Sequence, residues 1–316
     1  MRRSGLLISG IVLALSGCVA TKPRPPVEFQ SEPWTFAQVP GFKLTSAHYV
    51  VHTTLRDPVL REALPGFVEA AYENYTRLVP PARTPPERMQ VFLFAGRHQW
   101  EAFTRRFTGP RASTFLQVRN GGYSERGVSV IQYVSHEVTF PLFAHEGFHQ
   151  YLYKCVPTPV PPWVHEGLAV CCEGQRWDDH GIREFDPWYN PSRRNELAAA
   201  LIGDYLHPLR RLLETDAGHI ISGSNRSVGA YYGQVWALVL FLREGEGGKY
   251  ATGFERLLAS LATADAEQGA RAAHIWSDQR DFNYGRDLFC NFISADLETV
   301  EREYVAFMRA RFLGPG

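Results

Sequence analysis

The sequence predicts an α+β protein, with a small N-terminal α/β part built on a mixed sheet and a mainly helical C-terminal part. Three observations predict it. The chain has 316 residues, 45% of them hydrophobic, enough for one large core or two modest ones. Short apolar runs alternate with amphipathic stretches up to residue 139, and from residue 140 the apolar spacing is mostly helical. We therefore expect parts at 41–139 and 140–316.

Residues 1–17 are typical of a secretory signal. Two arginines are followed by an apolar run of about ten residues, too short to span a bilayer as a mature helix. The run ends in LSGC, which resembles the lipobox of bacterial lipoproteins. This resemblance implies that Cys18 carries lipid and anchors the protein in the bacterial cell envelope on its extracytoplasmic side. Val19, where no aspartate stands, favours the outer membrane.

The charge composition excludes some partners. Of the 33 Lys and Arg residues two precede Cys18, so a processed chain keeps 31 against 33 Asp and Glu, a net charge near −2. A nucleic-acid-binding protein needs a basic face. No G-x-G-x-x-G or P-loop pattern occurs. We expect the lipid anchor to bring the protein to a membrane, and we expect neither nucleic acid nor nucleotide as a partner.

Residues 18–40 are expected to form a tether, because they are rich in proline and polar residues (TKPRPPVEFQSEP). Folded structure is then expected to begin near Gly41. In the first part the apolar spacing predicts strands at 48–53, 89–94 and 127–133, with helices at 58–78 and 97–107 and a loop around Gly121 and Gly122.

The second part reads as a series of helices. The predicted ranges are 140–154, 162–174, 194–213, 229–244, 250–261 and 284–312, the last in broken pieces. Arg193 and Arg194 are expected on a solvated helix face. An exported protein permits disulfides, so Cys155 is expected either to pair with Cys171 or Cys172 or to remain a buried thiol.

The helix at 140–154 contains the motif H-E-x-x-H, formed by His145, Glu146 and His149. Residues four apart lie above one another on a helix, so the two imidazoles can converge on one ion with Glu146 alongside. A catalytic Zn²⁺ site typically has three protein ligands and one open position, and His₂Glu is a recurring ligand set. Glu166, at the start of the next helix, completes that set.

The motif and its sequel resemble the gluzincin metallopeptidases, in which the third zinc ligand is a glutamate on a downstream helix. The run W-x-x-E-G-x-A that begins at Trp163 is similar to the aminopeptidase-N branch and to bacterial peptidase-MA-like proteins. The resemblance implies a zincin-like helical part and a zinc peptidase that acts on peptide or protein substrates. Motif-level similarity covers about residues 140–175, with looser similarity over about 45–245.

Two features depart from that pattern, and one rival pattern is absent. Sixteen residues separate His149 from Glu166, slightly fewer than in the aminopeptidase-N pattern, and Gly147 stands inside a helix, where glycine costs about 1 kcal/mol relative to alanine. A metzincin would have a histidine where Cys155 stands. His165 projects about 100° away from Glu166 around its helix, so only one of them is expected to face the ion.

Three further assignments follow, each with an alternative. Glu173, two turns after Glu166, is a candidate to accept the free N–H of a zinc-bound histidine, or is a solvated carboxylate. The resemblance implies an oxyanion-stabilising tyrosine, for which Tyr232 is favoured over Tyr231, or Tyr232 is an ordinary half-buried side chain. The strand at 127–133 is either the sheet edge that holds extended substrate or an internal strand.

The expected function is therefore zinc-dependent hydrolysis of peptide bonds, with Glu146 as general base and Tyr232 or a backbone N–H stabilising the oxyanion. The alternative is a binding lipoprotein that keeps a peptidase-like scaffold at the envelope without catalysis. The intact Glu146 favours the enzyme, because a purely structural metal site needs no base.

Overall fold

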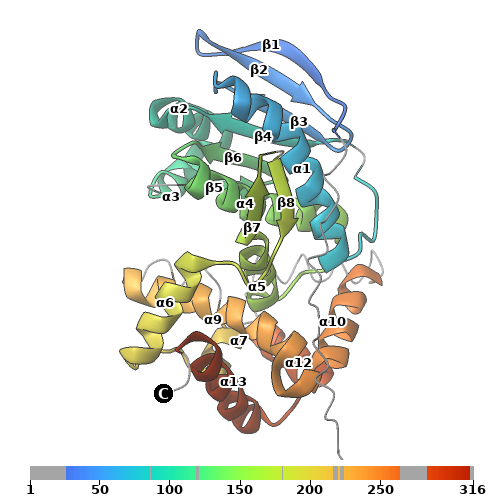
Figure 1. The fold of residues 1–316 in the computed structure, drawn as a ribbon, viewed down its shortest axis with the longest axis vertical. Helices are drawn as coiled ribbons and strands as arrows, with labels where there is room; N and C mark the ends of the chain where they lie inside the picture. Colours follow the sequence, from blue (N-terminus) through green and yellow to red (C-terminus); the bar gives the residue numbers. More distant parts are fainter. Residues whose placement is uncertain are drawn as a thin grey trace, which may run out of the picture.

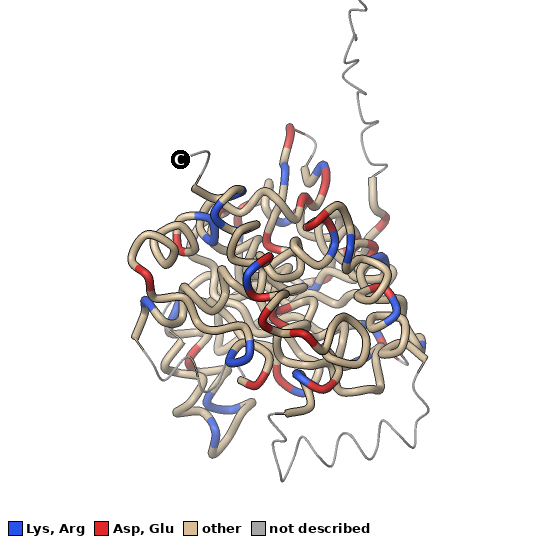
Figure 2. Tube along the Cα trace, turned by 90° about the horizontal axis from the view of Figure 1, so that it is seen from below, with Lys and Arg blue, Asp and Glu red and all other residues tan. Residues whose placement is uncertain are grey.

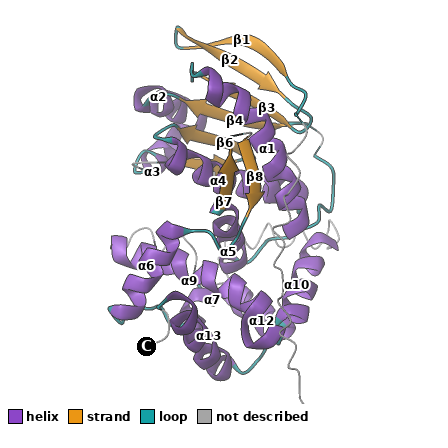
Figure 3. Ribbon diagram, viewed as in Figure 1, coloured by secondary structure: helices purple, strands orange, loops and turns teal. Residues whose placement is uncertain are grey.

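The chain is an α+β protein, as the sequence predicts (Figure 1). The computed structural model describes residues 26–85, 87–118, 121–179, 181–215, 220, 224–263 and 283–313. The signal segment and Cys18 lie outside these residues. In Figure 3 the strands gather in the upper half of the molecule, and the lower half is made of helices.

A mixed six-stranded sheet forms the first part, in the order β1-β2-β3-β4-β6-β5. Strands β1, β2 and β3 are antiparallel, β3, β4 and β6 run parallel, and β5 pairs antiparallel with β6 at the far edge. The strands are β1 (Gln30–Phe36), β2 (Val39–Thr45), β3 (Tyr49–Thr53), β4 (Met89–Phe94), β5 (Gly122–Glu125) and β6 (Val128–Gln132).

The folded chain begins earlier than expected. Strand β1 lies inside the stretch 18–40 assigned to a tether, so the expectation that structure starts near Gly41 is wrong. Pro33 is compatible with β1 because this strand is at the sheet edge. Trp34 and Phe36, two residues apart, pack their rings 6.4 and 4.9 Å from that of Phe94. The surrounding prolines and polar residues mask this alternation of aromatic residues, so the sequence did not predict β1.

The two faces of the sheet carry different helices. Along β4, Val91 and Leu93 belong to the large core shared with α1 (Pro58–Leu78) and α4 (His136–Cys155), while Phe92 and Phe94 face the cluster under α2 (Arg97–Thr108). Helix α1 begins where predicted because the Asp57 carboxylate accepts the N–H groups of the first turn. A short helix, α3 (Ala112–Phe115), follows α2.

The helical part differs from the prediction in two places. The expected single helix 194–213 is two helices, because the chain turns at Gly203 and at Asp204, whose φ is 51°. The second difference is a hairpin of β7 and β8, which the sequence did not predict and which packs Trp177 and Phe185 onto Phe67 of α1. The elements are α5 (Pro162–Glu173), β7 (Gln175–Asp178), β8 (Gly181–Phe185), α6 (Pro191–Ile202), α7 (Leu209–Leu213), α9 (Asn225–Glu244), α10 (Ala251–Thr263), α12 (Asn283–Phe292) and α13 (Leu297–Phe312).

Two glycines let neighbouring elements approach the helices that carry the motif residues. A Cβ on Gly147 would lie 2.5 Å from the Tyr75 hydroxyl, which donates a hydrogen bond to the Ala144 carbonyl of α4. A Cβ on Gly167 would lie 2.6 Å from the Val235 carbonyl of α9. The helical glycines are therefore explained by packing, since either methyl group would push a neighbour away.

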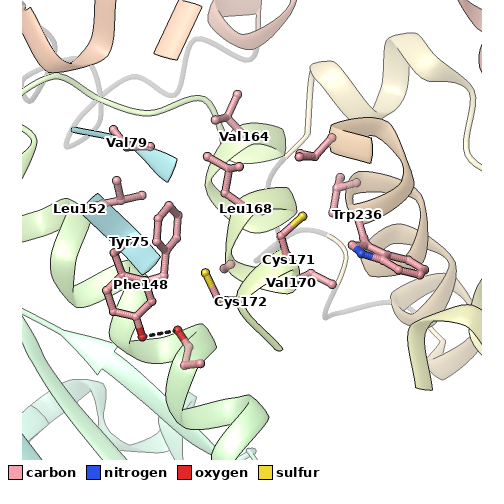
Figure 4. Close-up of a cluster of buried hydrophobic side chains, with 14 of the residues drawn as sticks. Tyr75, Val79, Phe148, Leu152, Val164, Leu168, Val170, Cys171, Cys172 and Trp236 are labelled. Atoms are coloured by element: carbon pink, nitrogen blue, oxygen red, sulfur yellow. Dashed lines mark hydrogen bonds between the residues drawn. The ribbon is translucent and has the colours of Figure 1, made fainter. Parts of the chain in front are cut away.

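The core between α1, α4, α5 and α9 contains three of the four described cysteines. Figure 4 shows two of them, Cys171 and Cys172, and the Tyr75 hydrogen bond as a dashed line. All four described cysteines are free, so of the two alternatives the buried thiol is confirmed and the pairing of Cys155 with Cys171 or Cys172 is not. Helices α4 and α5 pack with His149 beside His165, and Cys171 lies six residues beyond His165. Cys155 lies six residues beyond His149. Because α4 and α5 run in opposite directions, Cys155 and Cys171 therefore lie toward opposite ends of the helix pair. Burial raises the pKa of both Cys155 and Cys171 to about 12.

Positive and negative residues are interspersed along the chain in the view of Figure 2, consistent with the nearly balanced composition. Among the residues that the structure describes, no helix is both long enough and apolar enough to cross a bilayer.

Candidate metal centre

The H-E-x-x-H residues and Glu166 meet where α4 packs against α5. The Nε2 atoms of His145 and His149 lie 3.3 and 3.6 Å from Glu166 Oε2. One ligand atom from each residue can be chosen so that all three lie within 4.8 Å of one another. The structure thus brings together the three residues that the sequence pattern selects.

These distances fit a tetrahedral zinc ion. Two ligand atoms that are each 2.0–2.1 Å from such an ion lie about 3.3 Å apart. Glu166 Oε2 is buried and has no hydrogen-bond partner within the described residues, although both Nε2 atoms are near it. An unsatisfied buried carboxylate oxygen costs free energy, which a shared cation would recover. The donor set and its spacing therefore fit Zn²⁺.

The charges around this point favour a cation. Burial opposes ionisation of Glu166, but His149 and the contacts with both imidazoles hold the pKa of its carboxyl well below the usual range. Burial also opposes a charge on His145, yet Glu166 and Glu173 raise the pKa of that imidazole to about 10. The carboxylates of Glu166 and Glu173 that favour a proton on the His145 imidazole also favour a metal ion beside it.

The outer face of His145 is held by a network of charged groups. His145 Nδ1 lies 2.9 Å from Glu173 Oε1, so the ring donates there and presents Nε2 to Glu166. Arg193 of α6 donates to both oxygens of Glu173 at 2.9 and 3.0 Å, and Asn190 donates to Oε2 at 2.9 Å. Burial is outweighed by Arg193 and His145, and the pKa of Glu173 falls to about 2.

His149 is held in a different way. Its Nδ1 atom is buried and has no hydrogen-bond partner in the described part of the chain. Its ring stacks on that of His165, with centroids 4.2 Å apart and planes 5° from parallel. Burial lowers the pKa of both imidazoles, which favours two neutral rings in contact. His165 is not one of the three converging residues, but it packs directly on one of them.

Glu146 is placed to act as a base. It is 9% exposed, and burial raises the pKa of its carboxyl to about 7 although His145 opposes the shift. The backbone of Ser124 in β5 hydrogen-bonds to the carboxylate. A carboxyl with such a pKa exchanges its proton readily near neutral pH.

Tyr232 and Tyr231 have different surroundings on α9. The Tyr232 ring centroid lies 6.1 Å from that of His145, and the Arg193 guanidinium lies 4.8 Å above the Tyr232 ring. Burial raises the pKa of Tyr232 well above its usual value, so its hydroxyl keeps its proton. Tyr231 is fully buried in the core. The structure therefore brings Tyr232 beside the three converging residues.

The edge strand next to the site is not the one expected. Strand β6, predicted at 127–133 as a candidate edge, pairs with β4 on one side and β5 on the other, so it is internal. The edge is β5, where the sequence predicted a glycine-containing loop. Gln132 donates to the Gly121 carbonyl, and the antiparallel alternation then directs the backbone groups of Gly122 and Ser124 away from β6.

The sequence did not predict the roles of two residues at this site, Arg193 and His165. Arg193 was expected on a solvated face, and the structure instead places it under Glu173 and against Tyr232. No local signal marks it, because its role arises from how α6 packs. His165 was visible beside Glu166, but a helical projection alone did not reveal the stack on His149.

The fold and this arrangement define an α+β protein with a candidate His-His-Glu metal centre. Comparison of the sequence with models of known protein families finds no match, and a search of curated proteins finds none either.

Proposed function

We propose that the protein is a zinc-dependent peptidase of the gluzincin type, anchored through Cys18 to the bacterial cell envelope. One observation carries the proposal: the Nε2 atoms of His145 and His149 lie 3.3 and 3.6 Å from Glu166 Oε2, close to the spacing of tetrahedral zinc ligands, and the buried base Glu146 stands on the same helix. A structural metal site needs no such base.

Zinc bound by the three residues would polarise a water molecule and the scissile carbonyl. Glu146 takes the proton of the attacking water and passes it to the leaving amine. Tyr232 keeps its phenolic proton and donates it in a hydrogen bond to the oxyanion that develops from the carbonyl. Glu173 and Arg193 orient His145 throughout.

Strand β5 would align the substrate. The backbone groups of Gly122 and the Ser124 carbonyl point away from β6 and would pair with an added strand, while the Ser124 N–H is hydrogen-bonded to the Glu146 carboxylate. A peptide that pairs with β5 therefore has its backbone beside the base.

The test is Glu146→Gln. The variant should keep one zinc per chain and lose at least about a thousandfold in peptide hydrolysis, because the amide cannot accept the water's proton. Glu298→Gln, an exposed position in the first turn of α13, is the matched control and should change neither property. Zinc is measured by atomic absorption and hydrolysis with quenched fluorescent peptides.

Two results would contradict the proposal. If purified wild-type protein supplied with zinc holds none, the metal assignment fails. If it holds zinc and hydrolyses no peptide bond, the non-catalytic binding lipoprotein takes its place.

A further inference from the structure

Two pockets flank the metal centre along one face of α4. The first, about 610 Å³, is here named the Tyr189 pocket and is lined by His136, Val138, Leu142, Trp177, Tyr189 and Arg193, among others. The second, about 660 Å³, is named the Tyr153 pocket and is lined by Ser124, Arg126, His149, Tyr153, Val156 and His165, among others.

The positions of the lining residues along α4 show how the two pockets are arranged. Val138, Leu142, Glu146, His149 and Tyr153 follow one another at intervals of three or four residues, so they share one face of α4. Glu146 therefore lies between the two pockets, and His149 lines the nearer end of the Tyr153 pocket. The fifteen steps from Val138 to Tyr153 span about 22 Å at 1.5 Å per residue. An extended peptide covers that length with about seven residues.

The outer ends of this face are apolar and exposed. Val138, Tyr189 and Tyr153 are 43, 45 and 59% exposed, and they are three of the eight large hydrophobic residues found exposed in the described part of the chain. Exposed apolar side chains gathered beside a polar centre mark surfaces that bind other molecules. The metal centre is thus flanked by apolar surface on both sides.

The floor of the Tyr189 pocket offers little to a charged ligand. Glu173, Arg193 and Asn190 hydrogen-bond to one another there. Trp177 donates its indole N–H to Gln175, whose amide donates to a backbone carbonyl. Glu137, His136 and Ser192 also line the pocket, and the rest of its wall is aromatic and aliphatic, which suits an aromatic side chain.

We propose that the enzyme is an endopeptidase that takes an extended polypeptide segment of about seven residues, with an aromatic side chain in the Tyr189 pocket. The proposal rests on the proposed peptidase function and specifies its substrate. A segment that fills both pockets continues past the metal centre in both directions, so the bond beside Glu146 is internal. Pairing with the free edge of β5 supports the extended conformation.

Peptides with acetylated N-termini and amidated C-termini test the internal cleavage. We expect blocked peptides of eight residues that contain one phenylalanine to be cut, and kcat/KM to rise at least about tenfold from four to eight residues. Mass spectrometry locates the cut bond. Cleavage only of peptides with a free terminus, one or two residues from that end, overturns the proposal and leaves the peptidase assignment intact. The absence of cleavage of every peptide, blocked or free, is instead a failure of the proposed function.

Binding gives a second readout that does not need turnover. In zinc-loaded Glu146→Gln protein, fluorescence anisotropy should show the eight-residue peptide binding at least about tenfold more tightly than its phenylalanine-to-alanine version. Adding Val138→Glu should remove this preference, because it places a charge on the pocket wall.

The matched control is Val59→Glu, a second exposed valine in the first turn of a helix, on α1 and outside both pockets. It should leave the preference unchanged. Equal affinity of the phenylalanine and alanine peptides, or an equal effect of the two valine variants, overturns the assignment of the Tyr189 pocket.

Discussion

The two histidines of H-E-x-x-H present the same nitrogen to Glu166, but the protein holds their rings in different ways. His145 is fixed by a hydrogen bond to a carboxylate that Arg193 and Asn190 bind in turn. His149 has no such partner among the described residues and lies flat against His165. Metal-binding histidines usually donate their second nitrogen to a carboxylate or carbonyl. This site therefore combines an electrostatic support with a packing support.

The difference teaches where the site tolerates change. A hydrogen bond depends on the direction of a donor and on charge, whereas a stack depends on the shape and plane of a ring. Substitutions on the His145 side should be sensitive to charge, and those on the His149 side to shape. The predictions below follow this contrast from the largest expected effect on zinc affinity to the smallest.

Arg193→Ala should break the electrostatic support. It leaves the buried Glu173 carboxylate without its cation, so the free energy of unfolding should fall by about 3 kcal/mol. With Glu173 no longer fixed, zinc affinity should fall about tenfold to a hundredfold. Affinity is measured by competition with a chromophoric chelator, and stability by urea denaturation of the metal-free protein.

Arg194→Ala is the control for that prediction, because Arg194 lies next to Arg193 in the sequence but packs over Phe312 and donates to the Arg311 carbonyl near the end of α13. We expect it to leave zinc affinity unchanged. Arg193→Lys should restore part of the affinity, since the charge returns without the forked geometry. If Arg193→Ala binds zinc as tightly as the wild type, the support of His145 does not depend on this network.

His165 variants test the packing support. His165→Ala removes the ring on which His149 stacks and should weaken zinc binding about threefold to tenfold, a smaller effect because no charge is lost. His165→Phe keeps a flat ring and should retain most of the affinity. Equal weakening in both variants would show that His165 acts through its nitrogens, and the stacking account would be wrong.

Gly147→Ala acts on the backbone that carries both histidines. The new methyl group meets the Tyr75 hydroxyl, so we expect the free energy of unfolding to fall by about 1–3 kcal/mol. Tyr75→Phe removes the nearest atom, and the next one lies 3.4 Å away, so the double variant should lose less than the sum of the two single variants. Additive losses in thermal or urea denaturation would contradict this explanation of the glycine.

Local patterns predicted the converging residues of the site better than their surroundings. The apolar spacing of α1, β4, α4 and α5 gave their existence and nearly their bounds, and helical periodicity alone aligned His145 with His149. The position of Glu166 next to the two histidines was inferred from the frequency of His₂Glu sets in zinc sites. The segment between α4 and α5 contains no sequence signal for how the two helices pack.

What the sequence did not predict depends on contacts between distant segments. The sequence of strand β1 predicts a proline-rich tether. It forms a strand in the structure, where Trp34 and Phe36 pack against the aromatic face of β4. The short β5 is a strand because β6 offers it a partner. Arg193 is partly buried because α6 packs against α9 and brings this side chain to Glu173 at the end of α5. The partners of Trp34 and Arg193 lie outside any window that propensity or periodicity samples. Strand β5, in contrast, pairs with β6 across a short turn, and it was missed because it has only four residues and begins with glycine.

The central claim is that two imidazoles and one carboxylate bind a zinc ion. X-ray absorption at the zinc edge tests it most directly, because Zn–N and Zn–O distances of about 2.0–2.2 Å differ from the 2.3 Å of Zn–S. We predict one zinc per chain, with two imidazole ligands, oxygen in the remaining positions and no sulfur. A sulfur shell, which would place the ion among the buried cysteines, or the imidazole signature persisting in His149→Ala with two rings still bound, would contradict the account.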